Sequence, residues 1–181
     1  CRNIGAKNAQ YDWLLFLDQD EIASPMLLQK LGQFNDKHAY TVGMNLFLSA
    51  EAFEKINDDV ILNHFSDVMP GLRGKDGMAK VSTISNIGLV NKQKFFEVGG
   101  FDERFIGYGF HDADLQRRLK RFGTIQIHIH DANAFHITHD KGVVSTIAKD
   151  IYTEKEDSGL YDTKQHYLTI IIPVRNQFEY F

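Results

Sequence analysis

The feature that most constrains the fold of this chain is an apolar run at residues 13–17, WLLFL, that passes directly into an acidic cluster at 18–21, DQDE. A continuous apolar run of this length is typical of a strand buried on both faces of a sheet. In open α/β sheets, ligands bind beyond the carboxyl ends of such strands. Acids gathered there raise each other's pKa unless a cation joins them. The cluster therefore indicates either a metal site or a solvated turn before a helix capped by Asp20 or Ser24.

Length and composition set the broad class of the protein. With 181 residues, of which 43% are hydrophobic, the chain can bury the core of one domain and has room for an appendage. The net charge of -4 gives no basic footprint, so we expect no nucleic-acid partner. The single cysteine, Cys1, leaves no internal disulfide, and no apolar stretch reaches the roughly 20 residues that span a bilayer. We expect a protein of the cytoplasm, or one bound peripherally at the inner membrane.

Hydrophobic periodicity predicts an α/β domain in which helices and strands alternate. Helices are expected at 2–10, 25–34, 50–56, 92–98 and 112–122, and again from the residues after 141 to about 155. Strands are expected at 13–17, 39–48, 81–90, 124–130 and 167–176. The segment 57–80 is irregular, and loops of that length are usually functional lids or mobile segments. The polar, turn-rich segment 156–166 is expected to be a linker.

The pattern within two of these elements predicts which side chains are buried. The helix at 112–122 should place Leu115 and Leu119 inward and its arginines outward. The alternation IQIHIH that follows puts His128 and His130 on one face of a half-buried strand. We interpret these two histidines as lining a polar sheet face rather than binding a metal.

Three segments, in this order, resemble the carboxyl-terminal half of a GT-A glycosyltransferase domain of family 2 or the closely related family 7. RNIG at 2–5, with alanines at 6 and 9, resembles the helix that precedes the acidic strand end in family 2 enzymes. LLFLDQD at 14–20 resembles their DxD element. GGFDERFIGYGFHDADL at 99–115 resembles the acceptor and catalytic signature GGFDExFxGWGxEDxDL. The resemblance covers roughly residues 2–140 and implies an α/β fold of the GT-A type, a mixed sheet with flanking helices.

The resemblance implies a metal and a nucleotide donor at the acidic cluster. A divalent cation would neutralise the departing diphosphate of a UDP-sugar, and carboxylate oxygens suit Mn²⁺ or Mg²⁺. In the family the second acid of DxD is the main metal ligand, which here is Asp20. Asp18 lies nearer the ribose and is the second candidate metal ligand of the pair. A histidine beyond the catalytic helix often ligates the same ion. His136 best matches that position, and His139 could substitute.

The signature segment implies the catalytic and acceptor residues. Asp112 matches the family's catalytic aspartate, the general base for the acceptor hydroxyl, with helix capping as the alternative role. His111 replaces the acid that usually precedes it, and an imidazole could bind an acceptor hydroxyl. Tyr108 takes the place of the usual tryptophan, and the glycine beside it, Gly109, lets backbone approach a sugar closely. The alternative for Tyr108 is a packed tyrosine in a turn.

Four further residues keep two interpretations each. Asp102 and Glu103 either contact the acceptor or order their turn. Arg2 and Asn3 either bind the donor or are ordinary exposed helix residues.

The carboxyl end, LTIIIPVRNQFEYF, resembles the strand that opens such a domain. We therefore expect 1–155 to be the carboxyl-terminal half of one GT-A domain, 156–166 a linker, and 167–181 the opening strand of a following domain. Bacterial polysaccharide polymerases resemble this tandem arrangement, and the fragment alone could be inactive. We expect 168–174 to pair in parallel with 13–17, within the chain or from a second copy in a strand-swapped dimer.

The function implied is inverting transfer of a hexose or N-acetylhexosamine from a UDP-sugar to a saccharide acceptor. Two alternatives are a sugar-binding module without turnover and a metal-dependent hydrolase, although no H-E-x-x-H spacing is present.

Overall fold

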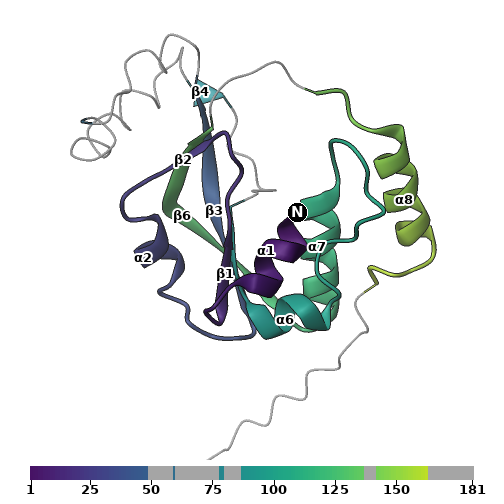
Figure 1. The fold of residues 1–181 in the computed structure, drawn as a ribbon, viewed down its shortest axis with the longest axis horizontal. Helices are drawn as coiled ribbons and strands as arrows, with labels where there is room; N and C mark the ends of the chain where they lie inside the picture. Colours follow the sequence, from purple (N-terminus) through teal and green to yellow (C-terminus); the bar gives the residue numbers. More distant parts are fainter. Residues whose placement is uncertain (49–58, 60–77, 80–86, 137–141, 163–181) are drawn as a thin grey trace, which may run out of the picture.

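The computed structural model describes residues 1–48, 59, 78–79, 87–136 and 142–162. Within them a mixed sheet is flanked by helices on both faces (Figure 1). The helices are α1 (Arg2–Asn8), α2 (Leu27–Leu31), α6 (Lys92–Glu97), α7 (His111–Arg121) and α8 (Thr146–Asp157). The strands are β1 (Trp13–Phe16), β2 (Glu21–Ala23), β3 (Ala39–Leu48), β4 (Met78–Ala79), β5 (Gly88–Asn91) and β6 (Ile125–His136).

The sheet has the strand order β1-β5-β3-β6-β2, with β4 paired to the far end of β3. The long central strands β3 and β6 are parallel, while β5 is antiparallel to both β1 and β3, and β2 is antiparallel to β6. Parallel and antiparallel pairs thus share one sheet, which confirms the mixed α/β class expected from the sequence.

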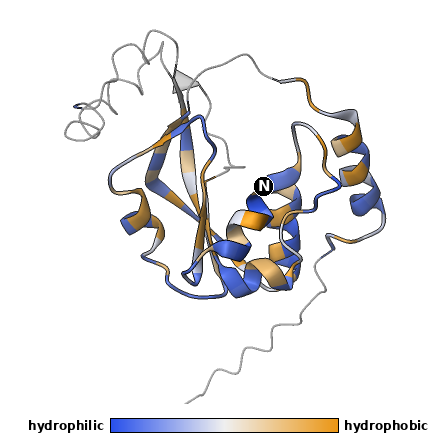
Figure 2. Ribbon diagram, in the orientation of Figure 1, coloured by the Kyte–Doolittle hydropathy of each residue, from blue (hydrophilic) through white to orange (hydrophobic). Residues whose placement is uncertain are grey.

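Two hydrophobic cores lie on opposite faces of this sheet. One joins the sheet to α1, α6 and α7, and the other joins it to α2 (Figure 1). Along β1, Leu14 and Phe16 pack into the first core, while Trp13 and Leu15 pack into the second. The strand is therefore covered on both faces, as its continuous apolar run predicts. Figure 2 shows hydrophobic and hydrophilic residues mixed along α8, as expected for a helix that packs on one side only.

The helices that flank the predicted signature segment agree with the sequence analysis. Gly99 and Gly100 end α6 with positive φ angles of 85° and 67°, and their amides bond to carbonyls of its last turn. Leu115 and Leu119 are buried on the inner face of α7.

Strand β6 is longer than predicted. It was expected to end at residue 130 but runs to His136, because its second half pairs with β3 after an irregularity in register. This places His136 at the end of a strand. His128 and His130 are exposed, in agreement with the polar sheet face that we expected.

The acidic cluster leads into a strand, not directly into a helix as one interpretation held. Residues Glu21–Ala23 form β2, which pairs with the end of β6 and so satisfies its backbone groups. Helix α2 begins only at Leu27, and no side chain caps it, so neither Asp20 nor Ser24 has the capping role considered for it.

Helix α8 ends at Asp157, two residues beyond the domain boundary that we predicted, and residues 158–162 of the expected linker are also described. Several expected features lie outside the described residues: the helix 50–56, most of the irregular segment and of the strand 81–90, His139, and the strand at 167–176. Within the described part of the chain, no helix is both long and apolar enough to cross a membrane.

Candidate active site

A cleft of about 960 Å³ opens where the start of α1 and the start of α7 meet the acidic turn after β1. Eight of the residues predicted for the site line it together, although they come from distant parts of the sequence: Arg2, Asn3, Asp18, Asp102, Tyr108, Gly109, His111 and Asp112. Asp20 and His136 form a pair of their own, and His139 lies outside the described residues.

Arg2 contacts both Asp18, which was predicted to bind the donor, and Asp112, which was predicted to be the general base. Its guanidinium forms an ion pair with Asp18, at the end of β1, and its Nη1 lies 3.3 Å from Oδ1 of Asp112, on α7. The same guanidinium stacks 5.0 Å from the centroid of the Phe101 ring. Arg2 is therefore not an ordinary exposed helix residue, because one cation holds carboxylates from two elements at one point of the cleft.

Asp112 is the second residue of α7 and does not cap it. The capping position belongs to Phe110, whose φ of 66° is in the left-handed region that non-glycine residues rarely adopt. The capping role considered for Asp112 is therefore wrong. Burial raises the pKa of Asp112, and the Asp18 charge raises it further, while the Arg2 charge acts in the opposite direction. A carboxyl with a raised pKa is suited to accept a proton.

Glu21 is a site residue that the sequence analysis treated only as part of the acidic cluster. Its side chain is 8% exposed, its Oε2 accepts the Asp18 amide N–H at 2.8 Å, and its Oε1 accepts the side-chain amide of Asn45 at 2.5 Å. Burial, above all, raises the pKa of Glu21 to about 7, with the charges of Asp18 and Asp20 adding to it. Glu21 therefore holds the DxD turn from inside the protein.

The Asp20 carboxylate and the His136 imidazole converge at the ends of paired strands. Asp20 Oδ2 lies 3.4 Å from His136 Nε2, and β2 pairs with β6 so that Glu21 faces His136. Oxygen and imidazole ligands together suit Mn²⁺ and related divalent ions. Over the described ranges no cluster of three or more His, Cys, Asp or Glu side chains could hold a metal. Asp20 and His136 would therefore supply two of the ligands that a divalent ion needs at this position.

Asn3 connects α1 to the predicted acceptor segment. Its Nδ2 donates to the Phe101 carbonyl at 2.8 Å and to Glu103 at 3.0 Å, and its Oδ1 accepts the Phe101 N–H at 2.9 Å. A Cβ on Gly100 would lie 2.7 Å from that Oδ1, so only glycine fits this turn. The amide of Asn3 orders the segment, and a donor contact by Asn3 stays a prediction.

Tyr108 presents its ring to the cleft with 61% of the residue exposed, which excludes the packed tyrosine considered as an alternative. Gly107 and Gly109 flank it with φ angles of 88° and 111°. Its carbonyl accepts the Ser145 N–H at 2.8 Å, and a Cβ on Gly107 would lie 2.9 Å from the Ser145 Cβ. The turn is thus held against the segment before α8, and an aromatic surface is left open to a ligand.

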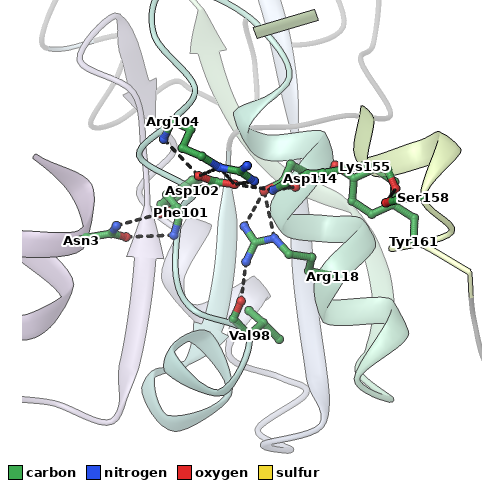
Figure 3. A network of polar contacts seen from close by, with 10 residues as sticks. All are labelled: Asn3, Val98, Phe101, Asp102, Arg104, Asp114, Arg118, Lys155, Ser158 and Tyr161. Carbon is green, nitrogen blue, oxygen red and sulfur yellow. Dashed lines mark hydrogen bonds and ion pairs between the residues drawn. The ribbon is translucent and has the colours of Figure 1, made fainter. Parts of the chain in front are cut away.

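Asp102 is bound within the protein by two cations. Arg104 donates to it from Nε and Nη2, and Lys155 Nζ lies 2.6 Å from its Oδ2 (Figure 3). The hydrogen bonds from Arg104 are the main reason why the pKa of Asp102 lies well below its usual range, and Lys155 lowers it further. Ordering of the turn, one of the two roles considered for Asp102, is therefore supported by its contacts.

Asp114 lies at the centre of a buried polar network that the sequence analysis missed. It is fully buried and accepts hydrogen bonds from Arg118, from Lys155 at 2.6 Å and from the Tyr161 hydroxyl at 2.7 Å (Figure 3). Arg118 also donates to the Val98 carbonyl at 2.5 Å. The prediction that the arginines of α7 point outward is wrong for Arg118, because Asp114 one turn earlier compensates its charge.

A mixed sheet with helices on both faces, and a cleft in which a strand-end acid, Asp18, meets the helix-start aspartate Asp112, define the class as a GT-A glycosyltransferase fold. The family model described as "Glycosyltransferase like family 2" matches residues 1–127, and the chain belongs to this family. A search of curated protein sequences gave no match.

The fold is also that of a solved glycosyltransferase. A crystal structure of GalNAc-T7 with UDP, GalNAc and Mn2+ superposes with a TM-score of 0.57 at 14% sequence identity. The match covers 86% of this chain and 33% of that chain, so our chain spans about a third of that protein's length. At this identity the likeness establishes the fold.

Proposed function

We propose that this chain forms the metal, acceptor and catalytic part of an inverting glycosyltransferase. The reaction is transfer of a hexose or N-acetylhexosamine from a UDP-sugar to a hydroxyl of a saccharide acceptor, in polysaccharide synthesis. The observation that carries the proposal is the pairing of Asp18 and Asp112 by Arg2 within one cleft. Membership of the family and the UDP, GalNAc and Mn2+ of the solved relative support it.

In this proposal Asp112 is the general base. The acceptor oxygen forms a bond to the anomeric carbon of the donor, the bond from that carbon to the diphosphate breaks, and the hydroxyl proton passes to a carboxylate oxygen of Asp112. Attack from the face opposite the leaving group inverts the anomeric configuration. Burial raises the pKa of Asp112 and so makes its carboxylate a stronger base, while the Arg2 charge lowers that pKa.

Asp20 and His136 would hold Mn²⁺ or Mg²⁺, with Asp18 nearer the nucleotide. Their convergence at 3.4 Å is the geometric support for this assignment. Such an ion, when bound, neutralises charge on the leaving diphosphate. Arg2, which already lies against Asp18, is placed to contact the donor on the same side.

The acceptor would lie between Tyr108 and the start of α7. The exposed Tyr108 ring suits the apolar face of a sugar, and Gly109 lines the same cleft beside it. His111 lines the same cleft and can bond to an acceptor hydroxyl, with Asp102 at its border.

The proposal is tested by the products that the complete protein makes from a panel of UDP-hexoses and UDP-N-acetylhexosamines with Mn²⁺ and oligosaccharide acceptors. We expect acceptor-dependent UDP release and a new linkage of inverted configuration by NMR. Release of free sugar regardless of acceptor would indicate the hydrolase instead. Tight oligosaccharide binding with no turnover of any donor would indicate a sugar-binding module.

A further inference from the structure

Helix α8, which lies beyond the residues 1–127 that the family model covers, supplies a buried lysine that contacts Asp102 in the lining of the cleft. We propose that Lys155 is a positioning residue that ties the turn carrying Asp102 to the helix carrying Asp112. This inference rests on the function proposed above and adds to it a residue that touches neither donor nor acceptor.

The ammonium group of Lys155 contacts two carboxylates and an aromatic ring. Its Nζ lies 2.6 Å from Oδ2 of Asp102 and 2.6 Å from Oδ1 of Asp114 (Figure 3). The same Nζ lies 5.0 Å from the centroid of the Phe105 ring. The residue is only 5% exposed. Lysine is rarely buried to this degree unless its charge is paired, so its burial indicates a specific role.

Lys155 is the cation, among the described residues, whose contacts join the two carboxylates. Arg118 pairs with Asp114 through Oδ2, and Arg104 pairs with Asp102 from an exposed position. In the described contacts each arginine forms an ion pair with one of the two acids, whereas Lys155 pairs with both. Without this ammonium, Asp102 and Asp114 would lose the cation that they share, and with it the two short contacts that hold the turn against the helix.

Both acids that Lys155 contacts lie on segments that also carry residues of the proposed active site. Asp102 lines the cleft in the segment that leads to Tyr108, and Asp114 lies in the same helical turn as Asp112. A helix moves as a unit, so a shift at Asp114 displaces the base. Displacements of about 1 Å can lower turnover by about 10²-fold.

The test compares K155M and K155R with the matched control K149M in the complete protein. Lys149 lies on the same helix but is exposed. Assayed below its unfolding transition, K155M is expected to lower kcat by about tenfold or more and to raise the KM for acceptor, with the KM for donor unchanged. K149M should match the wild type. A loss of folded protein alone would lower the apparent kcat without this split between the two KM values.

K155R keeps the test decisive if K155M does not fold. The guanidinium is wider than the ammonium and cannot repeat both short contacts at the same spacing, so the KM for acceptor should rise by about twofold or more. If all Lys155 variants that fold keep the acceptor KM and kcat of the wild type, the inference is wrong.

Amide hydrogen exchange separates this inference from the proposed function. Exchange in residues 101–109 should be faster in the Lys155 variants than in K149M, while β3 stays unchanged. If the wild type transfers no sugar, the proposed function fails but this comparison still decides whether Lys155 orders the turn. Unchanged exchange in 101–109 would overturn the inference in either case.

Discussion

Arg2 places one guanidinium between two carboxylates that lie 94 positions apart in the sequence, Asp18 and Asp112. The sequence left two interpretations of the acidic cluster at 18–21, a metal site or a solvated turn, and the structure gives each of its acids a specific contact or a buried position. Asp18 is paired to Arg2, Asp20 faces His136, and Glu21 is buried beneath the turn. At the scale of single residues, each acid of the cluster is therefore held by a specific partner or by burial, and the metal site stays a prediction.

Metal binding is predicted to depend on Asp20 and His136. D20A and H136A should each weaken Mn²⁺ binding measured by calorimetry, because each removes a ligand. Affinity should also fall on acidification, since carboxylate and imidazole must be deprotonated to ligate. Wild-type affinity in both variants would place the metal elsewhere. H128A, which changes an exposed histidine on the same strand, is the control.

Glu21 is predicted to make stability depend on pH. Its folded pKa of about 7 lies above the unfolded value of 4.5, so its ionisation opposes folding. Its contribution is most favourable below the unfolded pKa and declines as the pH rises through the folded pKa. Between about pH 5 and about pH 8, the metal-free wild type should lose up to about 3 kcal/mol of unfolding free energy that E21Q does not lose. Urea unfolding of both proteins at the two pH values gives these free energies. If the unfolding free energy changes equally with pH in the wild type and in E21Q, Glu21 does not titrate in this range.

At the scale of elements, close packing of strands leaves positions where only glycine fits. A Cβ on Gly88 of β5 would lie 2.1 Å from the hydroxyl oxygen of Tyr40 on β3, which is buried. G88A should therefore lower the unfolding free energy by about 1–3 kcal/mol, the usual cost of overpacking.

In contrast, Gly5 of α1 has open space around it, and G5A should stabilise the protein by about 0.5–1 kcal/mol. Thermal unfolding checks both, and equal effects of the two changes would contradict this account of β5.

The elements that the sequence predicted correctly carry their own local pattern. The apolar run of β1, the spacing of Leu115 and Leu119, and the paired glycines after α6 are signals within a few residues. Strand β2 has three residues, too few for a period, and exists because β6 pairs with it. The Lys155 network joins residues up to 53 positions apart, so no local pattern could reveal it. The site residues within the signature were predicted only because the motif preserved their spacing.

At the scale of the whole molecule, β1 is an edge strand of the sheet formed by the described residues. We predict that 168–174, which lie outside them, pair in parallel with β1, from the same chain or from a second copy. Removing residues 167–181 should then lower the melting temperature, because it strips β1 of that partner. Sedimentation before and after the truncation separates the two cases, since only a swapped dimer would become monomeric. A truncated protein as stable as the complete one would refute the pairing.

The central proposal is that sugar transfer takes place in the cleft between the starts of α1 and α7, with Asp112 as the general base. Its most direct test is the turnover of D112N in the complete protein, beside D150N, which alters an exposed aspartate of α8. The account predicts that D112N lowers kcat by about 10²-fold or more with UDP affinity unchanged, while D150N behaves as wild type. Near-normal turnover by D112N would contradict it.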